Sequence, residues 1–207
     1  LSGANLHNAD LRGANLNGVN LSHTNLKLAC LYRANLRGAN LDGANLEDTK
    51  FQVAIYDAQT IWPTGFAYKS LGAIGPGANL NGADLNTANL RHVDLQGANL
   101  LGAYLGGADL TGANLQGARL SSADLRRAYL TGAYLRSARL NGANLAGVDL
   151  RAADLTDIEF EQIESIAGAD FSQVHGLSAE KRSHLLSHSA AELDTWNSFT
   201  RHTTLES

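Results

Sequence analysis

A leucine stands at every fifth position over two long stretches of the chain. The first stretch covers residues 1–46 and closes with Phe51, and the second covers residues 80–155 and closes with Phe160. A period of five fits neither the 3.6-residue helix nor the two-residue strand, so neither element can continue through these stretches. The pattern therefore predicts a backbone that turns once in every five-residue phrase.

The other positions of the phrase are also restricted. A small residue, mostly Ala, stands two positions before each leucine, Asn or Asp stands directly before it, and Gly is frequent two positions after it. In an extended piece the small residue and the leucine point to one side and the Asn or Asp to the other. Glycine supplies the positive φ of a tight turn. We expect four such corners to close a square coil, and the coils to stack about 4.8 Å apart with the leucines inside.

Residues 62–76 interrupt the pattern between a first block, 1–61, and a second block, 77–173. Pro63 fixes its own φ and holds Trp62 extended, so the phrase cannot continue there. The segment contains several apolar residues, Trp62 and Phe66 among them. We interpret it as a flap that covers one face of a single continuous solenoid. The alternative is a recognition loop, because loops on rigid scaffolds often carry binding residues.

The pattern changes again after Phe160. The register slips by one residue, so that Ile166 and Phe171 take the leucine position of a last partial coil. Ser178 is a favourable N-cap, and helical spacing follows it. We therefore expect a capping helix from Ala179 to about residue 188, within a helical region at 178–197 that covers the end of the solenoid. Residues 198–207 are expected to form a disordered tail.

The Ala-(Asn/Asp)-Leu-x-x phrase resembles the repeat of the pentapeptide-repeat family, over residues 1–61 and 77–173. The resemblance implies an all-β fold, a right-handed quadrilateral β-helix, here of about seven to eight coils with a C-terminal α-helical cap. The phrasing of the flap and the purity of the leucine positions resemble cyanobacterial members of the family. A fold of this kind does not specify an activity.

Residues that would carry catalysis do not form a recognisable constellation. The sequence has no phosphate loop and no dinucleotide fingerprint, and its glycines belong to the turns. Glu180, His184 and His188 share one side of the expected helix, but His184 is not followed by the glutamate of a metalloprotease motif. We expect a protein that is not an enzyme and that has no cofactor and no metal.

Candidate binding residues come from two places. Stacking residues twenty apart gathers arginines and a tyrosine at one corner of the second block, where they could accept a phosphate or carboxylate. The simpler reading is that they are solvated side chains, with Glu159 pairing with Arg139. The flap supplies two aromatic candidates. The full set is Arg119, Tyr134, Arg136, Arg139, Trp62 and Phe66.

The charge distribution separates the candidate functions. Residues 1–51 carry five basic and four acidic groups and residues 78–160 carry seven and eight, while 161–207 carry three and seven. Some pentapeptide-repeat proteins inhibit a type II topoisomerase by mimicking DNA, which needs a continuous negative face. A near-neutral solenoid disfavours that alternative. We expect a protein-interaction module or a structural scaffold of unassigned role, and the sequence does not separate these two.

Partners and location follow from the same observations. We expect a protein partner, no nucleic acid and no membrane, and a monomer or a weak dimer formed through the uncapped N-terminal end. The chain has no Met and begins inside a phrase, so we expect its native N-terminus to lie upstream. The cytoplasm is the default location.

Overall fold

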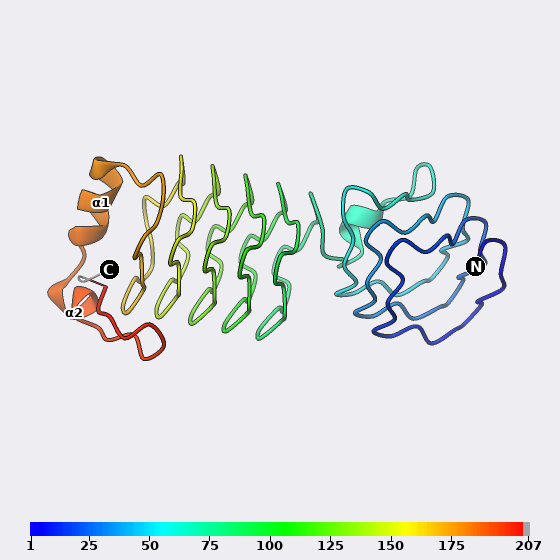
Figure 1. Ribbon diagram of the computed structural model, residues 1–207, viewed down its shortest axis with the longest axis horizontal. Coiled ribbons are helices and arrows are strands. Elements are labelled where there is room, and N and C mark those ends of the chain that lie inside the picture. The colour runs from blue at the N-terminus through cyan, green and yellow to red at the C-terminus, as the bar shows by residue number, and fades with distance from the viewer. Residues whose placement is uncertain (205–207) are drawn as a thin grey trace. The chain divides into compact units, whose positions relative to one another are not determined.

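The computed structural model describes residues 1–204 (Figure 1). The chain forms two compact units, residues 1–80 and 81–207. Three helices are present in the described residues: η1, a 3-10 helix at Tyr68–Ser70, and the α-helices α1 at Ala179–Leu186 and α2 at Ala190–Leu193. None of them is long and apolar enough to cross a membrane. Each unit is otherwise built from short bridges and turns.

Single-residue parallel bridges join each coil to the next. The residue directly before the leucine makes the bridge, as in the columns Asn5–Asn25–Asn45 of the first unit and Asp84–Tyr104–Asp124 of the second. Partners in these columns are twenty residues apart, which is the length of one four-sided coil. The coils of the second unit are seen stacked in Figure 1. The predicted coil is therefore present in both units.

The interior of each coil contains the leucines and the small residues two positions before them. Leu105 and Ala103, for example, are both fully buried, as are the corresponding residues of most neighbouring coils. Fully burying a leucine side chain contributes roughly 1.5–3 kcal/mol. Repeated at every corner, this burial holds together a structure that has almost no helix or long strand.

Each turn contains a left-handed residue two positions after the leucine, whether or not that residue is glycine. The φ angle is +64° at Gly107, +57° at Arg127 and +60° at the β-branched Val53. The left-handed conformation costs an L-residue roughly 1–2 kcal/mol. The frequent glycine at this position follows from that cost.

The Asn or Asp before the leucine stabilises the turn that follows. Its Oδ1 accepts a hydrogen bond from the backbone N–H two residues later, at 3.1 Å from Arg126 N to Asp124 Oδ1 and at 3.1 Å from Ala146 N to Asn144 Oδ1. This is an Asx turn. It gives the preference for Asn and Asp a structural reason beyond an outward orientation.

The interruption in the first unit begins later than the sequence predicts. Ile61 bridges Asn40, and the N–H of Leu41 donates to the Ile61 carbonyl, so Trp62 occupies a leucine position after one inserted residue. Thr60 takes the small-residue position, where its hydroxyl donates to Leu36 O at 2.9 Å. The prediction that Trp62 cannot follow the pattern is therefore wrong, because an extended residue before proline suits this position.

The interruption also ends earlier than predicted. Ile74 bridges Ile55, so the coil has resumed by residue 74. The following leucine position is Gly75, where an added Cβ would lie 2.6 Å from the ring of Tyr56. The Tyr56 ring therefore occupies the space that a side chain at this position would need, and its hydroxyl donates to Pro76 O at 3.0 Å. Tyr56 is a leucine position of the preceding coil.

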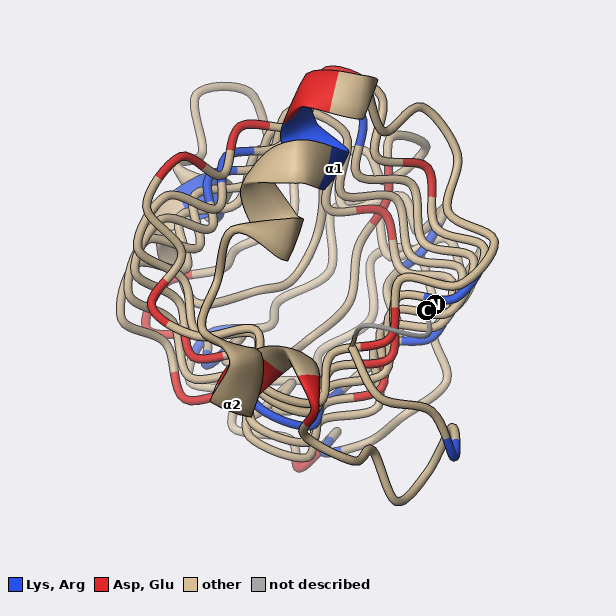
Figure 2. Ribbon diagram, turned by 90° about the vertical axis from the view of Figure 1, so that its left-hand side faces the viewer, with Lys and Arg blue, Asp and Glu red and all other residues tan. Residues whose placement is uncertain are grey.

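The end of the second unit follows the predicted slip in register. Ser165 bridges Asn144, twenty-one residues away, and Ile166 after it is fully buried. Ser178 and Ser189 cap α1 and α2 by accepting hydrogen bonds from backbone N–H groups. Seen end-on in Figure 2, α1 and α2 lie over opposite sides of the coils.

Residues 198–204 differ from the disordered tail that the sequence predicts. Trp196 forms an antiparallel bridge with Thr203, and Thr200 and Thr204 are buried. The Thr204 hydroxyl donates to Ile166 O at 3.0 Å. The Thr204 hydrogen bond therefore ties this segment to the last coils, a contact that the helical and repeat patterns do not reveal. Residues 205–207 lie outside the described part of the chain.

Candidate functional site

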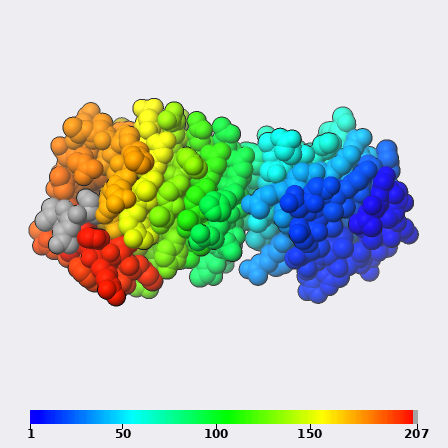
Figure 3. All heavy atoms as spheres, in the orientation of Figure 1, coloured from blue at the N-terminus to red at the C-terminus, as the bar shows by residue number. Residues whose placement is uncertain are grey.

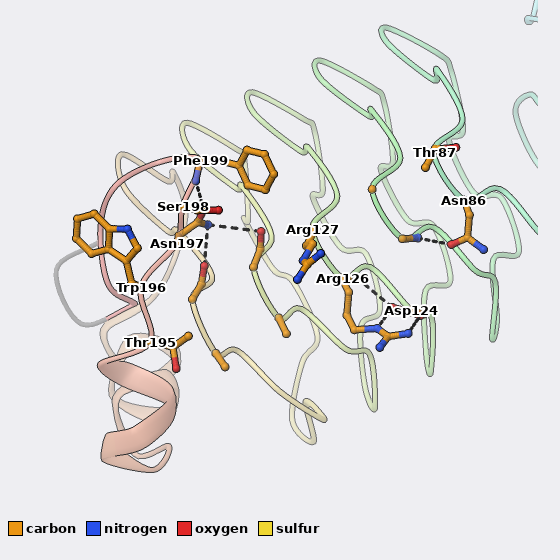
Figure 4. Close-up of a pocket in the computed structure, with 16 residues that line it drawn as sticks. Asn86, Thr87, Asp124, Arg126, Arg127, Thr195, Trp196, Asn197, Ser198 and Phe199 are labelled. Carbon is orange, nitrogen blue, oxygen red and sulfur yellow. Dashed lines mark hydrogen bonds and ion pairs between the residues drawn. The ribbon is translucent and has the colours of Figure 1, made fainter.

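A groove with a volume of about 720 Å³ lies on one corner of the second unit (Figure 4). One side is a row of turns from successive coils, and we call residues 86–87, 106–107, 126–127, 146–147 and 167–168 the turn row. The other side is the chain after α2, Thr195 to Phe199, which we call the 195–199 segment. In Figure 3 the C-terminal residues form a ridge against the coils of this unit.

Small residues make the floor of the groove. The turn row consists of glycine and alanine at residues 106–107, 146–147 and 167–168, and the arginines of 126–127 lie between them. At Gly106 an added Cβ would lie 2.8 Å from Asn86 Oδ1, which accepts the Gly106 N–H at 2.9 Å. The hollow thus follows from the missing side chains of the neighbouring turns, and Asn86 closes one end of it.

The two arginines of the turn row differ in their partners. Arg126 donates to both carboxylate oxygens of Asp124, from Nε at 2.8 Å and from Nη2 at 2.6 Å. The hydrogen bonds from Arg126 hold the pKa of the Asp124 carboxyl below its ordinary value, despite the opposing effect of burial. Arg127 makes no ion pair with any residue in the described range, 1–204. Its guanidinium is the positive charge of the groove that has no ion pair in this range, and Figure 4 shows Arg127 on the turn row.

Asn197 holds the 195–199 segment in place. Its side chain is buried, and its Nδ2 donates to Gly168 O at 2.7 Å. Its Oδ1 accepts the N–H of Phe199 at 2.9 Å and of Thr200 at 3.3 Å. One amide side chain thus fixes both the position of the segment and the shape of its own turn.

Phe199 is the aromatic wall of the groove. Its side chain is 55% exposed, and its ring meets Tyr129 edge-on with centroids 5.6 Å apart. Trp196 is 59% exposed, but in Figure 4 its ring points away from the turn row. The described lining of the groove therefore contains one cation without an ion pair and one exposed aromatic ring, and it has no nucleophile with an activating base.

The corner expected from the sequence is brought together only in part. Tyr134 and Arg136 border a second hollow of about 510 Å³ together with Asp154 and His175. Arg136 lies 3.6 Å from Asp154, measured from Nη2 to Oδ2. The charge of Arg136 is therefore shared with a neighbour rather than left for a ligand.

Arg119 and Arg139 lie in the adjoining column of bridges. They are bridge partners on successive coils, and Arg139 Nε lies 3.2 Å from Glu159 Oε2. This is the surface pair that the stacking of residues twenty apart predicts. A pair of this kind is worth at most about 1 kcal/mol.

Trp62 and Phe66 pack onto the inside of the first unit. The Trp62 ring stacks on Tyr68 at a centroid distance of 4.9 Å and meets the buried rings of Phe51 and Tyr56 edge-on. Phe66 stacks on Trp62 at 5.9 Å. These contacts favour the covering interpretation of the segment over the recognition loop.

His184 of α1 and His188, which follows the helix, do not build a metal site in the described residues, where no group of three His, Cys, Asp or Glu side chains is placed to hold an ion. His188 instead lies with its Nδ1 3.0 Å from Glu192 Oε2. Glu192 also accepts a hydrogen bond from the Ser165 hydroxyl at 2.7 Å. These residues join α2 to the last coil.

Sequence reasoning did not identify the groove. The Arg126-Arg127 doublet is visible in the sequence, but it lies outside the corner that the stacking of residues twenty apart indicates. A signal was present in the turn row, where phrases twenty residues apart carry glycine or alanine around this doublet. The contribution of the 195–199 segment was hidden, because these residues follow no repeat.

Comparisons with known proteins match residues 1–27, 29–54, 77–100, 88–127 and 128–162 to pentapeptide repeats, in eight copies. No curated protein matches the chain. Among solved structures the chain is similar to HetL, a pentapeptide repeat protein involved in heterocyst differentiation regulation from the cyanobacterium Nostoc, with 28% identity over 84% of each chain and a TM-score of 0.33.

Two further solved structures are similar to the chain. One is a pentapeptide repeat protein from the thylakoid lumen of Arabidopsis thaliana, with 34% identity over 62% of this chain and 79% of that chain and a TM-score of 0.28. The other is Rfr23 from the cyanobacterium Cyanothece, with 19% identity over 84% of this chain and 88% of that chain and a TM-score of 0.30.

Parallel coils with a leucine interior define each unit as a β-helical solenoid. The matched repeats cover more than half of the chain. The chain therefore belongs to the pentapeptide-repeat family, whose fold is a right-handed β-helix, and the family expected from the sequence is confirmed.

Proposed function

We propose that the protein is a non-enzymatic interaction scaffold that docks a partner protein in the groove between the turn row and the 195–199 segment. The observation that carries this proposal is that one groove with a floor of small residues contains both Arg127, whose guanidinium makes no ion pair in the described residues, and the partly exposed aromatic ring of Phe199. Arginine and aromatic side chains are the residues that contribute most often to protein interfaces.

The mixed charge of the surface supports a protein partner over DNA mimicry. Figure 2 shows Lys and Arg interspersed with Asp and Glu around the coils. A mimic of duplex phosphates needs one continuous acidic face. Inhibition of a type II topoisomerase by mimicry thus receives no support from this distribution.

The proposal includes the role of the C-terminal helices as a cap on the last coil, in a solenoid of about seven to eight coils. A solenoid end exposes apolar side chains and unpaired backbone groups, which a cap covers. Leu185 of α1 and Leu193 of α2 are buried, and Lys181 Nζ donates to the carbonyl of Ile158. These contacts support a cap that also places the 195–199 segment beside the turn row.

Site-specific photo-crosslinking in the cells that make the protein tests the docking proposal. A benzophenone amino acid replaces Phe199 in one variant and Leu28, an exposed residue of the first unit, in the control. We expect a discrete adduct from position 199 and none from position 28. The partner is then identified by mass spectrometry and must form a saturable complex with the purified chain.

The two positions make the result decisive. Both side chains are partly exposed, so a folded variant at either site can react with a neighbour. If the folded variant at position 199 gives no adduct above the level at position 28, the docking proposal is wrong.

A further inference from the structure

We propose that the occupant of the groove is an extended acidic segment of the partner, with a carboxylate on Arg127 and a neighbouring apolar side chain against Phe199. This inference rests on the proposed docking function and specifies its chemistry. It is carried by the contacts, the charges and the length of the groove.

Arg127 sets the charge of the ligand. The lining of the groove contains two basic residues and one acidic residue, and the acidic Asp124 is already bound by both Nε and Nη2 of Arg126. Arg127 is left with its guanidinium donors free in a chain whose net charge is −4. A guanidinium favours carboxylates because its parallel N–H groups match their two oxygens.

The backbone conformation of Arg127 strengthens this assignment. Arginine stands at a left-handed position, φ +57°, where most turns of the second unit have glycine. Its stem packs on the next turn, since a Cβ added to Gly147 would lie 3.3 Å from Arg127 Cγ. The side chain of Arg127 is therefore placed over the neighbouring turn of the groove floor.

Phe199 sets the apolar requirement. Tyr129 packs against the Phe199 ring, and Phe199 still exposes 55% of its surface to solvent. A ligand with an aliphatic or aromatic side chain next to its carboxylate would cover this surface. In an extended chain neighbouring side chains point to opposite faces, so a carboxylate directed to the turn row directs the next side chain to the 195–199 segment.

The turn row sets the length and backbone of the ligand. Four coil-to-coil steps separate the turn at residues 86–87 from the turn at 167–168, which at about 4.8 Å each gives roughly 19 Å. An extended peptide rises about 3.3 Å per residue, so about six residues fit. The small floor residues admit a peptide backbone, whereas a folded domain could reach only the rim.

Single-stranded nucleic acid is the competing class of ligand, since it also uses arginine and aromatic residues. It needs a basic track for successive phosphates. The groove offers one free cation, and residues 161–207, which supply the 195–199 segment, carry three basic and seven acidic groups. The charges thus favour a peptide with few carboxylates over a polyphosphate.

Fluorescence anisotropy with defined probes tests this inference on the full chain. The probes are the labelled hexapeptides (Glu-Leu)₃, (Gln-Leu)₃ and (Lys-Leu)₃, and labelled hexathymidylate. We expect saturable binding of (Glu-Leu)₃ that weakens between 50 and 500 mM NaCl, as a screened ion pair requires. The other three probes should bind at least about threefold more weakly, which is within the range of one exposed ion pair.

Matched variants locate the binding. Arg127→Gly removes the guanidinium and suits the left-handed backbone, and Arg33→Gly makes the same change at φ +59° in the first unit. Phe199→Ala is paired with Tyr32→Ala, at an exposed aromatic residue of the first unit. We expect (Glu-Leu)₃ affinity to fall about two- to fivefold with the first member of each pair and to be unchanged with the second.

Each outcome decides the inference. No saturation by (Glu-Leu)₃ at 1 mM, equal affinity for (Lys-Leu)₃, tighter binding of hexathymidylate, or no response to Arg127→Gly in a chain with unchanged thermal unfolding would each overturn it. If one of these results is obtained but the crosslinking adduct at position 199 is still observed, the docking function stands and only the acidic character of the ligand is wrong.

Discussion

The replacement Asn197→Ala tests whether a single amide side chain holds the wall of the groove. Asn197 donates a short hydrogen bond to Gly168 O at 2.7 Å and a long one to Gly147 O at 3.5 Å, and it accepts two, from the backbone N–H groups of Phe199 and Thr200. Removing this side chain leaves those groups without their partner in a buried place.

The expected magnitude follows from the count of hydrogen bonds. Each neutral hydrogen bond contributes about 1 kcal/mol, so opening of the 195–199 segment should become easier by about 2–3 kcal/mol. Since 1.4 kcal/mol is a factor of ten, hydrogen-exchange protection of local amides should fall roughly 30- to 150-fold. The amides to follow are those of Asn197 and Arg201, which donate to His202 O and Asn197 O within the same turn.

The assay is amide hydrogen exchange followed by NMR, with Asn144→Ala as the control. Asn144 makes the ordinary Asx turn, in which its Oδ1 accepts only the N–H of Ala146. The control should affect its own turn and leave the 195–199 segment unchanged. Unaltered protection of the Arg201 amide in Asn197→Ala would show that Asn197 does not anchor the segment.

Three further changes test the coil itself. Asp149→Asn keeps an acceptor for the turn but removes a buried charge. Burial raises the pKa of the Asp149 carboxyl, but its hydrogen bonds, first among them the one from Arg151, hold that pKa below its ordinary value. The charged carboxylate stabilises the fold above the unfolded pKa of about 3.9, and this stabilisation is lost as pH falls through the folded pKa. In urea titrations the variant should therefore be less stable than the original chain by about 1 kcal/mol at pH 7 and equally stable at acid pH. Val53→Gly relieves φ +60° and should raise the free energy of unfolding in urea by up to about 1 kcal/mol; a lower free energy of unfolding refutes strain there. Gly75→Ala places Cβ 2.6 Å from the Tyr56 ring and should cost about 1–3 kcal/mol in thermal unfolding, and an unchanged midpoint would contradict that packing.

The repeat was predictable because one local rule is used at every corner. A leucine in each fifth place, such as Leu105, can be buried only if the chain turns after it, and the columns of bridges confirm that spacing. The slip in register before Ile166 was also predictable, because the five-residue spacing resumes after it: Ile166 and Phe171 are five positions apart and both are buried.

The interruption and the groove depend on information that no local pattern contains. Trp62 takes a leucine position only because one inserted residue restores the register, and Gly75 is set by the Tyr56 ring of another coil. The groove requires Asn197 to reach a carbonyl twenty-nine residues earlier in the chain. Contacts of this kind are decided by packing between coils, which a period of five does not encode.

A double-mutant cycle tests the central claim about the groove most directly. The four affinities are those of the original chain and Arg127→Gly for (Glu-Leu)₃ and (Gln-Leu)₃, measured by anisotropy at 50 mM NaCl. If a ligand carboxylate lies on Arg127, the coupling free energy should be about 0.5–1 kcal/mol and should shrink in 500 mM NaCl. A coupling of zero, with (Glu-Leu)₃ bound equally well by both chains, would contradict the account.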